Sequence, residues 1–368
     1  MQLPPPNVKL GRNRLDLGGI PRVSLGAWLR QFLRAHGRKL WWLHSAYALA
    51  LGIGVVLFAR EGFGHARWLA VSLGLAWLLV VLLFRLARHG DRPGALDEPE
   101  RKTRARFYVM TYALKNLYQG MLFFLLPFYW NSTTFDSPNC WFVLVLATCA
   151  VVSTLDLVFD QVLMRRRWLA SIFHGITLFG CLNLVTPALF PETRTLWSLL
   201  AATAVAVISF WTLHVTARQL KKRIYIALFM LSLGVGLGLA FVGRAEIPPV
   251  PMYVSSAAVG PKQLADGRLA MAVKTLHPSV IQELIAVTDV VVPGGKGDRL
   301  RHVWRHNGRE IHRSSEDTSR IEGPKGRVRL RSMLSDRDLS GDLVGRWSVD
   351  VETEDGQLVG RTEFDVAD

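Results

Sequence analysis

Long apolar runs are the feature of this sequence that most limits what the chain can fold into. An α-helix rises about 1.5 Å per residue, so a run of roughly 18 apolar residues or more can cross a hydrocarbon layer about 30 Å thick. Seven such runs lie before residue 243 of the 368-residue chain. We therefore predict an all-α membrane bundle of seven transmembrane helices over residues 40–242, with crossings at Leu40–Phe58, Trp68–Leu86, Phe107–Trp130, Trp141–Val162, Trp168–Leu189, Leu196–Val215 and Ile224–Val242.

Basic residues alternate between the segments that flank these runs. The N-terminal arm and the loops after the second, fourth and sixth runs hold 22 Lys and Arg residues, whereas the other loops hold 3. Loops rich in Lys and Arg remain on the cytoplasmic side of a membrane. The pattern predicts a multi-pass protein with its N-terminus in the cytoplasm and its C-terminal region outside.

The net charge of +15 is of a size that can attract nucleic acid. Half of the 44 Lys and Arg residues, however, lie in the segments expected to face the cytoplasm. The charge is therefore explained as a signal of membrane topology. We expect the lipid bilayer as a partner and no nucleic acid.

The first 39 residues are polar, basic and rich in proline near their start, and we expect no cleavable signal peptide among them. The stretch LGAWLRQFLRAHGRK, residues 25–39, places its apolar side chains on one helical face and its arginines mostly off that face. This pattern predicts an amphipathic helix on the inner membrane surface, with an extension of the first crossing as the alternative. Residues 1–39 are thus expected to form a cytoplasmic basic arm.

The character of the sequence changes after the last apolar run. Residues 243–258 contain three closely spaced prolines in the stretch IPPVP and are predicted to be an extended linker. From residue 259 onward apolar and polar residues alternate, with turn signals at Asn307-Gly308 and Asp355-Gly356. Residues 259–368 are therefore predicted to form a small all-β, immunoglobulin-like sandwich. Its predicted core contains Trp304, Trp347, Val349, Val351 and Phe364.

Three stretches of this region, HVWRHNGREI, LRSM and GRWSVDVETEDGQLVGRTEFDV, resemble the C-terminal module known as domain of unknown function 2914. With the preceding helices, the whole chain is similar to the bacterial membrane-protein family of unknown function 5924. Over the helical part this resemblance rests on architecture alone. It implies a protein of the inner membrane of a Gram-negative bacterium with a β-domain in the periplasm, and it supplies no catalytic residues.

Charged residues occur inside the apolar runs. Asp156 and Asp160 lie in the fourth run, and Lys115 lies in the third. Counted from the basic residues at the inner ends of their runs, Lys115 and Asp156 are both about 13 Å deep, so we expect them to pair. An unpaired charge inside the membrane costs about 2.5 to 3.5 kcal/mol or more. The same inner third of the bundle holds the other members of this predicted polar cluster: Asn116, His174 and His214.

Two interpretations of the cluster remain open. In one, it forms a relay for protons or ions, or a catalytic cluster open to the cytoplasm. In the other, Lys115 and Asp156 form a structural pair that fixes helix register. Asp160 then lies near the lipid headgroups beside Arg165, and the two histidines are interfacial or satisfied polar groups.

The sequence contains no recognisable motif for catalysis, a cofactor or a metal. His302, His306 and His312 invite a zinc site, but no HExxH motif, Cys or clustered carboxylate accompanies them. The apolar runs carry two acids, fewer than a metal-dependent lipid transferase requires. We therefore expect no cofactor and no metal, and we do not predict an enzyme.

Small residues in the last apolar run indicate helix packing. Gly234 and Gly238 are four residues apart, which lets a second helix approach closely. This spacing is common in membrane helices and indicates no chemistry. It also leaves the oligomeric state open.

These observations favour a non-enzymatic envelope protein of the inner membrane. Its membrane bundle would anchor the periplasmic β-sandwich, and residues 259–368 would recognise another envelope component, a protein or a glycan. The alternative is a transporter or a proton-coupled membrane sensor that uses Lys115, Asp156, Asp160 and His174.

Overall fold

The computed structural model describes residues 66–86, 101–190, 192–262, 269, 273–292, 298–314, 326–335, 339 and 342–367. The first predicted crossing, Leu40–Phe58, and the amphipathic helix of the N-terminal arm lie outside these residues. In the described part of the chain, helices come first and strands follow, so the predicted order of a helical part and a β-domain is confirmed.

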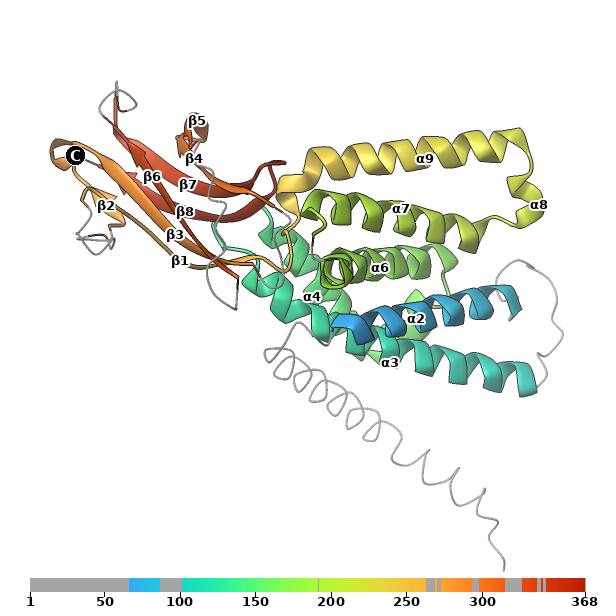
Figure 1. Cartoon of the computed structure of the whole chain (residues 1–368). Helices are drawn as coiled ribbons and strands as arrows, with labels where there is room; N and C mark the ends of the chain where they lie inside the picture. The colour runs from blue at the N-terminus through green and yellow to red at the C-terminus, as the bar shows by residue number, and fades with distance from the viewer. Residues whose placement is uncertain are drawn as a thin grey trace, which may run out of the picture. The chain divides into compact units, whose positions relative to one another are not determined.

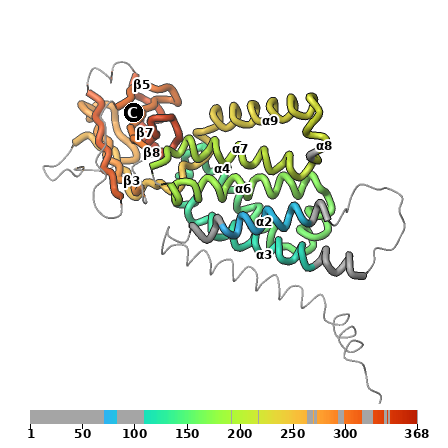
Figure 2. Tube along the Cα trace, turned by 45° about the vertical axis from the view of Figure 1, so that its right-hand side comes forward, coloured from blue at the N-terminus to red at the C-terminus, as the bar shows by residue number. Residues whose placement is uncertain are grey.

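The helical part contains long helices that share one apolar core. Figures 1 and 2 show α2, α3, α6 and α7 running side by side. Leu114, Leu146 and Leu184 in the core are completely buried. The described helices are α2 (Ala66–Leu86), α3 (Arg101–Asn131), α4 (Cys140–Thr154), α5 (Asp156–Val158), a π-helix η2 (Phe159–Leu163), α6 (Arg167–Leu189), α7 (Thr195–His214), α8 (Ala217–Leu220), α9 (Arg223–Val242) and a 3-10 helix η3 (Gly243–Glu246).

By length and apolar composition, three described helices can cross a membrane: Arg167–Leu189, Thr195–His214 and Arg223–Glu246. A fourth crossing is added if the bent pair Cys140–Thr154 and Asp156–Leu163 counts as one. Ala240 is the buried residue of α9, and its neighbour Leu239 is 69% exposed, as expected for a helix that faces lipid. The described residues thus give a membrane-associated helical part with three or four candidate crossings.

The fourth predicted crossing, Trp141–Val162, is not a straight helix. α4 ends at Thr154, the extended Leu155 follows, and the next helical segment is bent by 90°. The hydroxyls of Ser153 and Thr154 donate to carbonyls three residues back, and such bonds compete with the regular helical pattern. The break therefore separates the first predicted carboxylate, Asp156, from the apolar helix before it.

The glycine that packs α9 against α7 is not one of the predicted pair. A Cβ at Gly236 would lie 3.2 Å from Cγ2 of Val207, whereas a Cβ at Gly234 or Gly238 would meet nothing within 4 Å. Residues two positions apart lie about 200° apart around a helix axis, so Gly236 points away from its two neighbours. The predicted face at Gly234 and Gly238 therefore makes no close contact within the described chain.

The β-domain contains two sheets. The first has three strands in the order β1-β3-β6, and the second has five in the order β2-β8-β7-β4-β5 (Figure 1). Neighbouring strands are antiparallel except for β2 and β8. The strands are β1 (Tyr253–Gly260), β2 (Thr275–Leu276), β3 (Leu284–Val291), β4 (Leu300–His306), β5 (Arg309–Arg313), β6 (Arg327–Leu334), β7 (Gly345–Thr353) and β8 (Leu358–Val366).

The two sheets share a buried core. Trp304 on β4 and Trp347 on β7 are 0% and 1% exposed, and both rings contact that of Phe364 on β8. Val349 and Val351 are also buried. The alternation in the sequence therefore places these five predicted core residues on the inner face of the larger sheet.

The predicted linker, residues 243–258, takes part in both halves of the structure. β1 begins within it, at Tyr253, and pairs with β3. Val250 is buried in the helical core, and Met252 is buried in a cluster of the β-domain. Because these apolar side chains gain more from burial than from exposure, the segment packs and does not form a free stalk.

We predict that residues 253–368 fold when expressed alone and that Trp347→Ala destabilises them by about 3 to 5 kcal/mol, because a large buried side chain is lost. Urea unfolding followed by fluorescence measures the change. The matched control is Arg346→Ala, since the neighbouring side chain is 71% exposed and its loss should cost less than about 0.5 kcal/mol. Equal effects of the two substitutions would contradict a core role for Trp347.

Candidate functional site

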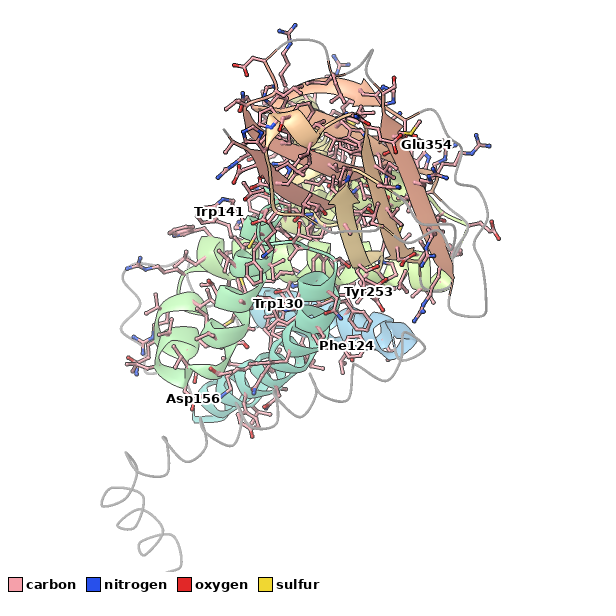
Figure 3. All side chains as sticks on the ribbon, turned by 90° about the vertical axis from the view of Figure 1, so that its left-hand side faces the viewer. Phe124, Trp130, Trp141, Asp156, Tyr253 and Glu354 are labelled. Atoms are coloured by element: carbon pink, nitrogen blue, oxygen red, sulfur yellow. The ribbon has the colours of Figure 1, made fainter. Side chains whose placement is uncertain are left out.

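The first part of the candidate site is an ion pair inside the helical part. Lys115 on α3 is 2% exposed, and its ammonium group contacts a carboxylate oxygen of Asp156, the first residue of α5. Asp156 is labelled in Figure 3. The pairing expected from their similar depth in the sequence is therefore present as a contact between two different helices.

The break at Leu155 explains why a positive charge is stable at this position. The C-terminal end of a helix leaves carbonyl groups without partners and carries a partial negative charge. α4 has its C-terminal end at Thr154, directly before the break. Lys115 therefore pairs with a carboxylate that lies two residues after the negative end of α4.

Asp160 lies close to this pair. The charges of Lys115 and Asp156 both act on its carboxyl group. Its Oδ1 atom is buried and has no hydrogen-bond partner. The Oγ1 atom of Thr111, one helical turn before Lys115 on α3, is likewise buried without a partner. Asp160 thus belongs to the ion-pair site, and no contact with Arg165 defines its position.

The histidines and Asn116 lie in separate hydrogen-bond groups. His174 on α6 is 1% exposed and bonds to the hydroxyls of Tyr118, at 2.7 Å, and Ser209, at 3.1 Å. His214 on α7 bonds to Ser171 at 2.8 Å. Asn116 is exposed and donates to a carbonyl of its own helix. The structure therefore divides the predicted cluster into four groups: the ion-pair site, His174 with its partners, His214 with its partner, and Asn116.

Tyr118, Ser171 and Ser209 were not predicted from the sequence. Ser171 and Ser209 lie in largely apolar helices, where serine side chains often bond to their own backbone. One signal pointed to Tyr118: it lies three residues after Lys115, which places both side chains on the same face of α3. No comparable signal identified Ser171 or Ser209.

The second part of the candidate site is the joint between the helical part and the β-domain. Asn139, directly before α4, is completely buried, and its amide donates to the carbonyl of Leu358 at 2.9 Å. The backbone N–H of Arg361 donates to Oγ1 of Thr134 at 3.1 Å. Gly360 lies between Leu358 and Arg361 on β8. A Cβ at this position would be 2.7 Å from the side chain of Val254 on β1, so only glycine allows the two strands to lie this close.

Charged groups complete the joint. Arg194, before α7, forms an ion pair with Glu354 at 2.7 Å, and Arg244 in η3 donates to the carbonyl of Asp355 at 2.6 Å. Glu354 is labelled in Figure 3. Asp298 accepts a hydrogen bond at 3.0 Å from the first N–H of α7, where a helix stabilises negative charge. The β-domain is therefore fastened to the ends of three elements of the helical part.

The pKa of Asp298 reflects its position in this joint. The pKa of Asp298 is raised to about 6, mainly by burial; the hydrogen bonds from Thr195 oppose this rise, and the negative charges of Asp355 and Glu354 contribute to it. The Oδ1 atom of Asp298 is buried without a partner. A proton on this carboxyl group would remove the unfavourable buried charge.

Two histidines of the β-domain, His302 and His306, are held by hydrogen bonds or ring stacking. His302 is buried, and both of its ring nitrogens have hydroxyl partners, Ser332 at 2.7 Å and Thr288 at 3.0 Å. Burial lowers the pKa of His302 to about 4. The ring of His306 stacks on Trp347, with ring centres 4.5 Å apart. Among the described residues, no group of three or more His, Cys, Asp or Glu side chains is placed to hold a metal ion.

We predict that the Lys115→Met/Asp156→Asn double variant unfolds at a higher temperature than either single variant. Removing one member leaves a buried charge alone, which can cost about 3 to 5 kcal/mol, whereas removing both is often nearly neutral. Thermal unfolding of the full chain in detergent measures the effect. Additive losses in the double variant would mean that the two groups do not interact.

For Asp298, the raised pKa means that the folded state binds more protons than the unfolded state between pH about 4 and 6. The group therefore contributes stability at low pH, and this contribution is lost as the pH rises through about 6. We predict that the unfolding temperature of the unmodified chain rises relative to that of Asp298→Asn as the pH falls from about 7 to about 4. The exposed Asp365→Asn is the control, and a constant difference between Asp298→Asn and the unmodified chain would contradict the prediction.

Comparison with known families agrees with this organisation. A model described as Protein of unknown function (DUF2914) matches residues 297–366. A model described as Family of unknown function (DUF5924) matches residues 26–282. No curated protein matches the chain. The two matches confirm, in the expected order, the resemblance found in the sequence. Because the second match covers more than half of the chain, the protein belongs to the Family of unknown function (DUF5924).

Proposed function

We propose that this chain is a non-enzymatic, seven-helix protein of the bacterial inner membrane that holds an immunoglobulin-like β-sandwich on the periplasmic side. There the sandwich recognises another envelope component, a protein or a glycan. The observation that carries the proposal is the joint. Asn139, Arg194 and Arg244 fasten the β-domain to the helical part, which suits a module presented in a defined orientation.

The distribution of aromatic and basic residues supports the proposed orientation. Aromatic side chains gather at membrane interfaces, and basic residues gather at the cytoplasmic ends of helices. The helix ends near the joint carry exposed aromatic residues, two of which are labelled in Figure 3: Trp130, Phe135, Trp141, Phe190 and Trp197. The basic residues of the segments that join the opposite ends of the helices are Arg165, Arg166, Arg167, Arg218, Lys221, Lys222 and Arg223.

The three-stranded sheet offers a surface for recognition. On β6 the exposed residues alternate with buried ones, and three of them are arginines, at positions 327, 329 and 331, followed by Met333. Asp289 on β3 pairs with Arg329 at 2.7 Å. The solvent-accessible positions described on β6 and its neighbour β3 thus carry three arginines and one acidic residue. This surface favours a partner that carries acidic or phosphate groups.

Crosslinking in intact cells tests the proposal. We predict that a photo-reactive amino acid at Arg331 captures a specific partner. The same amino acid at Arg346, on the other sheet and also exposed, should not capture it. Failure at Arg327, Arg331 and Met333 alike would contradict recognition through this surface.

A second function, transport or proton-coupled sensing, is favoured by the break in the fourth crossing. Discontinuous membrane helices often surround substrate or ion sites, because their free backbone groups and helix ends bind charge. The π-helix that follows the break, Phe159–Leu163, is a feature that often marks functional positions. Lys115 and Asp156 meet directly beside it.

A further inference from the structure

Negative charge exceeds positive charge at the break in the fourth crossing. Asp156 and Asp160 contribute two carboxylates, and the C-terminal end of α4 adds a partial negative charge. Lys115 contributes one positive charge, which acts on both carboxylates. Counted over the described residues, the group lacks one positive charge when both acids are ionised. A net charge within the apolar part of a membrane is unfavourable, so the site requires a further cation.

Among the described residues, no other charged group near η2 forms an ion pair with Asp156 or Asp160. η2 packs against α4, α5 and α6, and its Phe159 also contacts the ring of Tyr118 on α3. Cys140 and Cys149 are the titratable side chains of α4. On α6, Arg167 donates to the carbonyl of Leu213, and His174 bonds to Tyr118 and Ser209. Arg165 and Arg166 are exposed, as expected for residues that face water.

Unsatisfied oxygen atoms indicate where the cation would bind. Oδ1 of Asp160 and Oγ1 of Thr111 are both buried without a hydrogen-bond partner, and Thr111 is 2% exposed. Thr111 lies one turn from Lys115 on α3, and Asp160 lies on the segment that follows Asp156. Buried polar atoms are rarely left without partners, so these two, one on the helix of Lys115 and one on the segment after Asp156, point to a missing ligand.

We propose that Asp156, Asp160 and Thr111 form a binding site for one monovalent cation, either a proton on Asp160 or an alkali-metal ion held by these oxygens. One unit of positive charge brings the group to neutrality, whereas a divalent ion would leave it positive. Carboxylate and hydroxyl oxygens are suitable ligands for a hard cation. The inference deepens the second proposed function, because it names the ligand that transport or sensing would use.

Thermal unfolding of the purified full chain in detergent tests the proposal. At pH about 8, sodium or potassium chloride is compared with N-methylglucamine chloride at equal ionic strength. A bound alkali-metal ion stabilises the folded state with increasing concentration. We expect a rise of several degrees that is absent in Asp160→Asn and retained in the control Asp136→Asn, whose carboxylate is exposed in a loop outside the site.

The proton is distinguished by a second series. If the ligand is a proton, alkali-metal ions have no specific effect. Acidification then stabilises the unmodified chain relative to Asp160→Asn. If Asp160→Asn does not fold, Thr111→Val is the second variant, because it keeps the carboxylates of both Asp156 and Asp160. It is expected to weaken metal-ion binding about tenfold or, if the ligand is a proton, to shift the pH midpoint of the stabilisation. Identical responses of the unmodified chain and the site variant to both ions and pH would overturn the proposal.

The same proteins reconstituted into vesicles separate binding from transport. A saturable effect of cations on unfolding, without any flux of the cation through vesicles, would keep the site and remove the transport function. Flux that is unchanged by Asp160→Asn would mean that transport uses another path and that this site is not its cation site.

Discussion

The contact between Lys115 and Asp156 depends on the fact that the fourth apolar run does not continue as one helix. α4 has 15 residues, which span about 22 Å of a hydrocarbon layer about 30 Å thick. The chain then turns at Leu155, which brings a helix end, two carboxylates and a π-helix to one place. Without a buried cation nearby, this arrangement would expose several negative groups to an apolar environment. The ion pair therefore stabilises the break in the fourth run. The break in turn brings together the groups that form the site.

Local patterns predicted the features that depend on neighbouring residues. The Asn307-Gly308 turn has φ angles of 48° and 80°, which asparagine and glycine tolerate best. The alternation around Trp347 identified the inner face of its strand, and equal depth led to the pairing of Lys115 with Asp156. The break at Leu155 was missed because no proline or glycine marks it. Ser153 and Thr154 are the local signal, but such residues are frequent in unbroken helices.

The joint could not be predicted because its partners are far apart in the sequence. Thr134 and Arg361 are separated by 227 positions, and Asn139 and Leu358 by 219. A single polar residue in a loop gives no indication of which distant carbonyl or N–H it will meet. The same reason explains why His174 was placed with the charged residues and not with Ser209, which lies 35 positions away on the next long helix.

Val250 and Met252 give the two halves of the protein a mechanical connection. One side chain is held in the helical core and the other in the β-domain. Two residues span about 7 Å of chain at most, so no slack separates the two anchors. A pull on the sandwich from a tethered partner would reach the helical core at Val250 directly, since Pro251 alone separates Val250 from Met252. A movement of the sandwich would therefore be transmitted to the helical part and would not be absorbed by a flexible linker.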